Sequence, residues 1–294
     1  MYFFKRSFLL AVFYATSTTA FGQFRFDLSR PNFVPLIADP KETRIAVLPN
    51  LNNDGLTLDI GATLDLARLD FTGLDSASHS ALAFGVDFGT FSLLRREWNF
   101  KFPVDAADYI FGINLSYRAP LAPLFSLPTE VSARFRLSHI SAHLIDGSFD
   151  LASDRWRGRR PFTFSREFIS LVVALSNDYG RLYLGYELLF NTLPSNIAPQ
   201  SFQSGIELYA PNVPLSGLYP FLAIDFRLSP VWRWELERSE GYGGTTSIQL
   251  GVKTGTFGAR GVRVVYNYAS GLSWRGMYIG ERVDISSFGL FVDF

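Results

Sequence analysis

The last nine residues of the chain, 286–294, read Ser-Ser-Phe-Gly-Leu-Phe-Val-Asp-Phe. Successive side chains of an extended strand point to opposite faces. One face of this segment therefore carries Phe288, Leu290, Val292 and Phe294. The other face carries Gly289 and Asp293, which are small or charged. A bulky apolar face opposite a small or polar one is typical of a strand in a transmembrane barrel, where every second side chain meets lipid.

The same alternation recurs through most of the chain. It is clearest in residues 56–66, 82–89, 109–118, 182–190 and 222–228. We predict an all-β protein, a transmembrane antiparallel up-and-down β-barrel of about twelve strands, since single-chain bacterial barrels have an even number. The predicted strands are 43–48, 56–71, 80–94, 108–118, 129–145, 162–176, 181–190, 201–209, 219–236, 245–254, 261–269 and 282–294.

A soluble β-sandwich is the competing fold, in which the bulky residues would fill a shared core. The number of strands, the aromatic residues at their ends and the charges on the inner face favour the barrel. Eight charged residues are predicted to face the lumen, where opposite charges can neutralise one another. They are Asp59, Asp65, Asp87, Arg134, Arg136, Glu187, Asp225 and Arg227.

The composition agrees with dispersed apolar residues. The 294 residues are 48% hydrophobic, 16% aromatic and only 18% charged, whereas soluble proteins are about a quarter charged. The chain has no cysteine, and its formal net charge of zero gives no argument for a nucleic-acid partner. His79, His139 and His143 are the only histidines, and their spacing does not suggest a metal site. We expect no cofactor.

The first 22 residues read as a cleaved signal peptide. Lys5 and Arg6 precede an apolar run, and small residues end the segment at Gly22, so cleavage is expected before Gln23. The alternative, a membrane-anchoring helix, needs a longer apolar stretch. Residues 23–42 contain three prolines and are predicted to hang in the periplasm, line the barrel or plug it. Residues 43–294 are assigned to the barrel.

Turn lengths orient the predicted barrel. Residues 177–180 and 255–260 form short turns, whereas 146–161 and 270–281 are long, and short turns face the periplasm. The terminal aromatic Phe294 resembles the signal read by the outer-membrane barrel assembly machinery, the expected partner during biogenesis. The last strand then descends to the periplasm, and counting back makes the strand 129–145 ascend to the outer leaflet.

Polar residues interrupt the lipid-facing row of this strand. The row begins with Val131, Ala133, Phe135 and Leu137 and continues as His139, Ser141 and His143. The same parity places Glu167 of the following strand on this face, about level with His139. Uncompensated polar groups in hydrocarbon are costly, so the arrangement needs a reason.

A serine, a histidine that takes its proton and a carboxylate that orients the histidine form an activated nucleophile. We assign these roles to Ser141, His139 and Glu167, with His143 as an accessory group. Structural alternatives are contact with lipid headgroups, an inward turn at a bulge, or a brace to Asp146 or Asp150 in the next loop. That loop also carries four arginines suited to lipid phosphates: Arg155, Arg157, Arg159 and Arg160.

The His-x-Ser pair with a nearby Glu resembles lipid A deacylases. The His-x-Ser pair also resembles outer-membrane phospholipase A, in which an Asn follows. More widely, the mature chain resembles an uncharacterised bacterial outer-membrane family, domain of unknown function 1207. The segments that carry this resemblance are 33–42, 136–146 and 266–282. Ala142 and Ile145 differ from the Ser and Gly associated with those places. The resemblance implies an outer-membrane barrel without a known activity.

Two functions follow from these observations. The first is a passive or structural barrel, or a narrow pore with a charged lumen. The second is a serine-type lipid-acyl hydrolase whose site faces the membrane. In either case we expect export to the outer membrane, with its lipids and lipopolysaccharide as partners.

Overall fold

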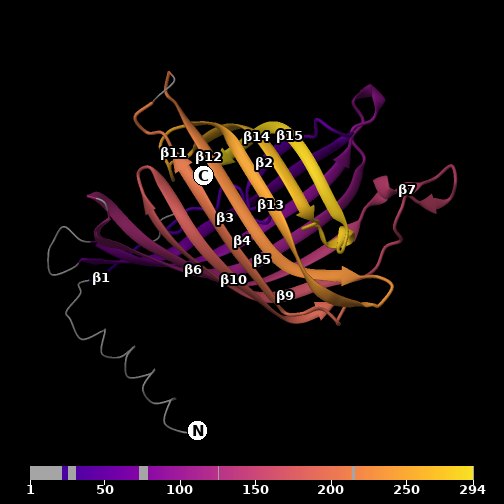
Figure 1. Ribbon diagram of the computed structural model, residues 1–294, viewed down its shortest axis with the longest axis horizontal. Coiled ribbons are helices and arrows are strands. Elements are labelled where there is room, and N and C mark those ends of the chain that lie inside the picture. Colours follow the sequence, from indigo (N-terminus) through magenta and orange to yellow (C-terminus); the bar gives the residue numbers. More distant parts are fainter. Residues whose placement is uncertain (1–21, 26–30, 73–78, 125, 214–215, 294) are drawn as a thin grey trace, which may run out of the picture.

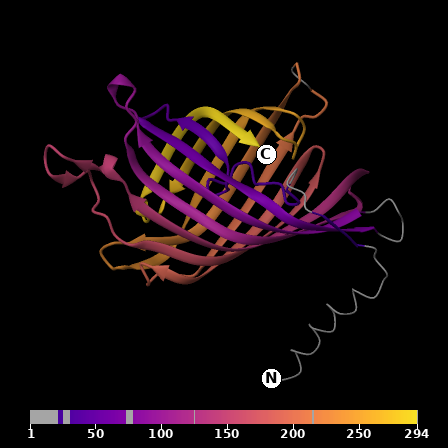
Figure 2. The ribbon, with the colours of Figure 1, turned by 180° about the vertical axis from the view of Figure 1, so that it is seen from behind.

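The computed structural model describes residues 22–25, 31–72, 79–124, 126–213 and 216–293. Twelve antiparallel strands close into a barrel, which confirms the predicted fold (Figures 1 and 2). In the described part of the chain, no helix is long and apolar enough to cross a membrane. The ring consists of β2 (Ile45–Pro49), β3 (Gly55–Thr72), β4 (His79–Arg95), β5 (Val104–Leu124), β6 (Leu127–Leu144), β9 (Phe164–Asn177), β10 (Gly180–Leu193), β11 (Gln200–Tyr209), β12 (Leu218–Arg233), β13 (Arg238–Thr254), β14 (Gly261–Leu272) and β15 (Arg282–Asp293).

The barrel closes through its shortest strand. β2 pairs on one side with β15, through Leu290↔Val47, and on the other with β3, through Leu58↔Val47. Every other strand of the ring pairs with its neighbours in chain order. A further strand, β1 (Gly22–Arg25), pairs with the end of β3. β2 thus joins β3, the first long strand, to β15, the last strand. Along the length of β2, neither β3 nor β15 has a free edge.

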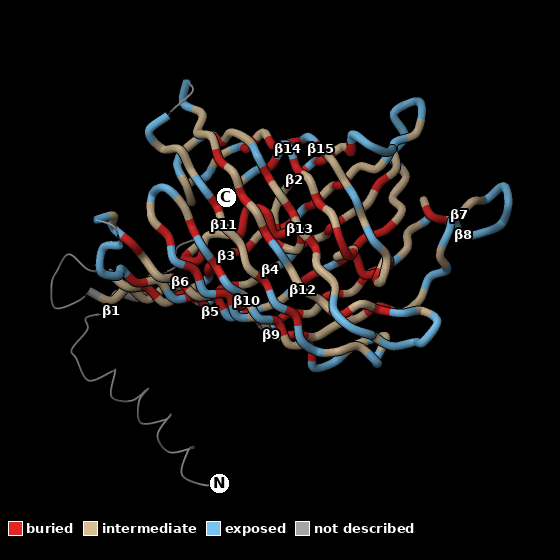
Figure 3. The backbone as a smooth tube through the Cα atoms, in the orientation of Figure 1, coloured by how far each residue is buried: buried red, intermediate tan, exposed pale blue. Residues whose placement is uncertain are grey.

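The alternation of the sequence appears as alternating burial along each strand (Figure 3). Large apolar side chains point outward, and Leu184, for example, is 70% exposed. Their inward neighbours are buried and many are polar. This is the inverse of a soluble protein and matches an outer wall in contact with lipid.

Several strands extend beyond their predicted ranges. β5 continues to Leu124 although Pro120 and Pro123 break its alternation, and β13 begins at Arg238 rather than 245. The added part of β13 contains glycines at 241, 243 and 244, which present no side chain to an alternation pattern. At the first strand the difference is opposite, since Thr43 and Arg44 precede β2.

The two ends of the barrel differ in their connections. At the end that we call the short-turn end lie the turns 178–179 and 255–260. At the opposite, long-loop end lie the connections 145–163 and 273–281. The first long loop contains η2 (Asp146–Ser148), β7 (Phe149–Asp150) and β8 (Arg155–Trp156). The β7–β8 hairpin stands away from the wall (Figure 1). Two other short helices, η1 (Trp98–Phe100) and η3 (Gly276–Tyr278), lie at the same end.

Residues 31–44 lie inside the barrel, and we call them the plug. Phe33, Leu36 and Ile37 are buried against lumen-facing side chains. The Ile37 N–H donates to Glu207 on β11, and Arg181 on β10 donates to the carbonyls of Val34 and Pro35. Three positions were considered for the segment 23–42. Residues 31–42 occupy the lumen, whereas residues 23–25 pair with the end of β3.

Candidate active site on the outer wall

The four predicted site residues come from two neighbouring strands near the long-loop end. On β6, His139, Ser141 and His143 alternate with the buried Ile140 and Ala142. His139, Ser141 and His143 therefore lie on the outer face of the wall, as their parity predicts. Strand pairing places His139 directly opposite Glu167 of β9.

His139 and Glu167 are in direct contact. The distance from Nδ1 of His139 to Oε1 of Glu167 is 2.8 Å, and both side chains are about one quarter exposed (25% and 28%). The other carboxylate oxygen of Glu167, Oε2, is buried and has no hydrogen-bond partner among the described residues. The imidazole also lies 4.9 Å from the ring of Phe111 on β5, centroid to centroid. Glu167 and Phe111 hold the ring from its two sides.

This contact defines what the imidazole can do. When Nδ1 carries the proton and donates it to the carboxylate, the lone pair of Nε2 is free to accept a proton. The carboxylate also stabilises the imidazolium that forms on protonation. His139 therefore has the arrangement of an oriented general base.

Ser141 lies two positions further along the same face, opposite Tyr109 of β5 and Ser165 of β9. Cα atoms with this spacing are roughly 7 Å apart. Within the described contacts, Ser141 and His139 share no hydrogen bond. The two side chains are thus neighbours on one face, and a hydrogen bond between them requires their rotamers to turn toward each other.

His143 and the loop carboxylates occupy separate positions. The His143 ring packs 5.9 Å from that of Tyr109. Asp146 accepts from the N–H of Gly147, and Asp150 accepts from Ala152 and Ser153. The structure therefore shows the loop carboxylates bonded within their own loop rather than to the histidines.

The four loop arginines do not form one cluster of free cations. Arg159 pairs with Glu281 at 2.6 Å and lies 4.4 Å from the Trp234 ring, so it braces the other long loop. Arg157 lies 3.7 Å from Asp150. Arg155 and Arg160 are exposed. Arg155, Arg157 and Arg160 are thus the exposed arginines of this loop, whereas Arg159 is engaged.

The predicted lumen charges lie inside the barrel, and several of them contact the plug. Asp87 of β4 pairs with Arg136 of β6, one strand further along the wall. Asp225 instead accepts from neutral donors on β10 and β11. The contacts with the plug are Arg134 and Arg136 to Glu42, Arg227 to Asp39, Glu187 to Lys41, Asp59 to Arg44, and Asp65 to the N–H of Asn32.

Glu42 is the most buried acid of the plug. It is 1% exposed and contacts Arg134 at 2.6 Å, as well as Arg136. Burial by itself raises the pKa of the Glu42 carboxyl, but the two guanidiniums outweigh burial and hold the pKa well below its usual range. Glu42 is therefore an ionised anchor that fixes the plug to β6.

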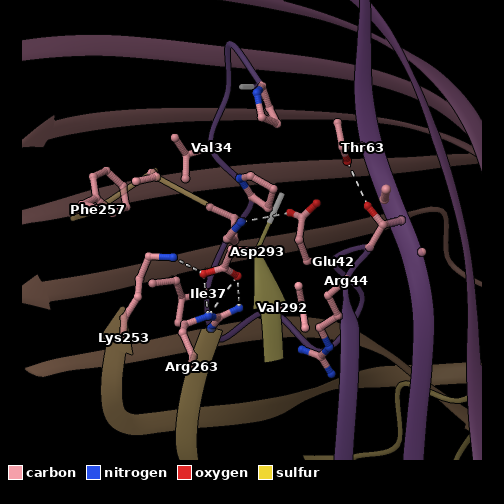
Figure 4. Close-up of a pocket in the computed structure, with 18 residues that line it drawn as sticks. Val34, Ile37, Glu42, Arg44, Thr63, Lys253, Phe257, Arg263, Val292 and Asp293 are labelled. Atoms are coloured by element: carbon pink, nitrogen blue, oxygen red, sulfur yellow. Dashed lines mark hydrogen bonds and ion pairs between the residues drawn. The ribbon is translucent and has the colours of Figure 1, made fainter. Parts of the chain in front are cut away.

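The cavities that the plug itself lines are small. A cavity of about 60 Å³ lies between the plug and the short-turn end of the wall, and its lining residues are drawn in Figure 4. Lys253 and Arg263 converge there on Asp293, while Val34 and Ile37 of the plug face them. A second cavity, of about 30 Å³, lies beside Arg134, Arg136 and Lys41. Spaces of this size hold one or a few water molecules.

Other residues on the outer face were not predicted. Ser165 lies opposite Ser141, and Asn191 of β10 lies opposite Glu167. Together with His139, Ser141, His143 and Glu167, they form what we call the polar patch. The parity of β9 could have identified Ser165, because it is two residues from Glu167. Asn191 could not be placed, because the pairing of β9 with β10 shifts between Leu189 and Asn191.

The chain matches a known protein family over nearly its whole length. The family model described as "Protein of unknown function (DUF1207)" matches residues 17–294. The chain belongs to this family. The match covers the plug, all twelve strands of the barrel and the polar patch. A comparison with curated proteins finds no match.

One solved structure that the comparison aligns with this chain is the crystal structure of Acinetobacter baumannii OccAB1. The two chains are 10% identical, and the TM-score is 0.35. The alignment covers 92% of this chain and 73% of OccAB1. Within the described residues of this DUF1207 member, no group of three or more His, Cys, Asp or Glu side chains is arranged to hold a metal ion.

Proposed function

We propose that this barrel resides in the outer membrane and hydrolyses acyl esters of outer-leaflet lipids at the polar patch. The observation that carries the proposal is the 2.8 Å contact between His139 and Glu167 on the lipid-facing wall, with Ser141 on the same face. Polar side chains that face lipid cost free energy, so several of them together on the outer wall indicate a functional site. A carboxylate placed on Nδ1 of a histidine beside a serine is the arrangement that nucleophilic acyl transfer requires.

The reaction would proceed in two steps. Ser141 Oγ attacks the ester carbonyl while its proton moves to Nε2 of His139, and the ester C–O bond breaks as that proton passes to the leaving alcohol. Water then attacks the acyl-serine with His139 as base, which releases the fatty acid and restores the serine. Glu167 orients the imidazole throughout. The substrate reaches the site from within the leaflet, because the patch faces outward.

The test measures fatty-acid release by mass spectrometry from purified protein mixed with phosphatidylethanolamine or with lipid A. We expect Ser141→Ala to abolish release, and Glu167→Gln to lower kcat by roughly 10²- to 10⁴-fold while leaving KM little changed. Ser204→Ala is the matched control, since Ser204 of β11 pairs with the outward-facing Leu184 and Phe226 and lies outside the polar patch. Release that is equal in wild type and Ser141→Ala would remove the proposal.

A second candidate is the passive barrel or narrow pore, which the charged lumen favours. The plug and its ion pairs occupy the interior, so conduction would require the plug to move. Single-channel recording in planar bilayers tests this function. If the barrel is a pore, the wild-type protein conducts and the variant Glu42→Gln, which loses the contacts of the plug with Arg134 and Arg136, has a longer open time. If neither protein conducts, the barrel is structural.

A further inference from the structure

A second concave site lies at the long-loop end, separate from the polar patch. It is a pocket of about 410 Å³ between the loops 50–55 and 273–285 and the ends of β4 and β5. This volume falls within the range of small-ligand sites. Trp274 and Tyr278 line it, and both are partly exposed. The pocket opens at the end of the barrel that we assign to the cell exterior.

The loop that carries the two aromatic residues is fixed in place. Arg275 donates to the carbonyl of Phe91 at 3.1 Å and to the hydroxyl of Thr57 at 3.0 Å. The N–H of Gly276 donates to Asp108 at 2.8 Å. Because these partners belong to three different strands of the wall, the residues that follow Trp274 are anchored. On the other side of Trp274, the N–H of Ser273 donates to the carbonyl of Glu281 at 2.9 Å. A prearranged aromatic residue binds a ligand without a large ordering cost.

The charges that line the pocket nearly balance. Three arginines and four acidic residues line it. Arg95 pairs with Asp105 at 2.8 Å, Asp54 with Arg96 at 3.3 Å, and Glu281 with Arg159 at 2.6 Å. Such a set offers hydrogen-bond donors and acceptors in many directions with little net charge. It therefore suits a neutral polyhydroxylated molecule better than an anion or a cation.

We propose that this pocket binds a neutral saccharide, whose apolar ring face packs on Trp274 while its hydroxyls bond to the surrounding polar side chains. Aromatic side chains supply a flat apolar surface, and the arginines, carboxylates and amides supply the hydrogen bonds. Trp274 also lines a cavity of about 60 Å³ on the lumen side, which reaches Lys41 of the plug. The same side chain thus separates the saccharide pocket from the interior of the barrel.

The saccharide could belong to an outer-leaflet glycolipid or be free in solution, and two probes distinguish these sources. Isothermal titration calorimetry of the full-length protein in detergent would use dephosphorylated core oligosaccharide for the first and maltoheptaose for the second. Inorganic phosphate serves as the anionic comparison. We expect at least one of the saccharides to bind and phosphate not to bind at the pocket.

Variants identify the pocket as the site. Trp274→Ala is expected to weaken saccharide binding roughly tenfold or more. Trp98→Ala is the matched control, because Trp98 lies in another loop of the same end and is 81% exposed. Asp284→Asn provides a second pocket variant at an exposed position, so that a folding defect at Trp274 does not decide the outcome. Failure of both saccharides to bind overturns the proposal. Binding that neither Trp274→Ala nor Asp284→Asn weakens also overturns it.

Discussion

Replacement of Glu42 by glutamine tests whether ion pairs hold the plug in the barrel. Glu42 is the carboxylate partner of Arg134, and both side chains are 1% exposed. Arg136 keeps Asp87 as a second partner, whereas the other close neighbour of Arg134 is the ring of Phe33 at 4.5 Å. The substitution therefore leaves a buried guanidinium without its counter-charge.

The size of the effect follows from the burial of the pair. Removal of one partner of a buried ion pair costs about 3–5 kcal/mol. Every 1.4 kcal/mol is a tenfold change in an equilibrium constant. The equilibrium constant for opening of the plug should therefore rise by roughly 10² to 10^3.5. The strands of the wall should keep their protection, because the backbone bonds that pair them with one another are unchanged by the substitution.

Hydrogen exchange followed by mass spectrometry measures this directly. Peptides that cover 31–44 should exchange faster in Glu42→Gln by the factor above, whereas peptides from β13 and β14 should not change. Asp54→Asn is the control, since its pair with Arg96 is exposed (56% for Arg96 and 72% for Asp54) and is worth at most about 1 kcal/mol. Exchange of 31–44 at the wild-type rate in Glu42→Gln would refute the reasoning.

Three further predictions concern pH, a loop glycine and the lipid-facing wall. The pKa of Glu42 in the folded protein is depressed, so its stabilisation of the plug is complete above the usual carboxyl range and is lost as the pH falls through the folded pKa. After correction for intrinsic exchange rates, hydrogen exchange of residues 31–44 should rise on acidification more steeply in wild type than in Glu42→Gln. Gly276→Ala should loosen the loop 273–281, since a Cβ there would lie 2.5 Å from Ala142 Cβ and 2.6 Å from the Phe164 ring; limited proteolysis of that loop checks it, and an unchanged cleavage rate contradicts it. Leu184→Arg should destabilise the barrel by about 2–4 kcal/mol if this 70%-exposed residue lies near the bilayer midplane; urea unfolding in lipid vesicles measures the loss, and equal midpoints would argue against a lipid-facing position.

The sequence predicts the wall of this barrel better than its contents. Alternation identifies all twelve strands, because each buries one face and shows the other to lipid. The contact of His139 with Glu167 follows from parity and the position of one loop, since the two strands are consecutive in the ring. For adjacent strands of the ring, the alternation and the position of the connecting loop are thus enough to predict which residues face each other.

The interior depends on contacts between distant parts of the chain. Glu42 and Arg134 are 92 residues apart, and nothing near either residue indicates the other. The prolines of the plug exclude a strand but do not say where the segment goes. Asn191 was missed for a different reason, because one irregular position in β10 changes which residue faces Glu167. Strand pattern does not report such irregularities.

The position of β2 bears on how the molecule is assembled. Glu42 precedes Ile45, the first residue of β2, by only three positions, and β2 is the strand that joins β15 to β3. The plug is therefore tethered directly to the seam of the ring. β15 follows every other strand of the ring along the chain, so it can pair with β2 only after the other strands have been synthesised. Because Glu42 lies three positions from β2, the plug is next to the seam when the wall closes. We infer that residues 31–44 are enclosed in the same step in which β2 pairs with β15 and the wall closes.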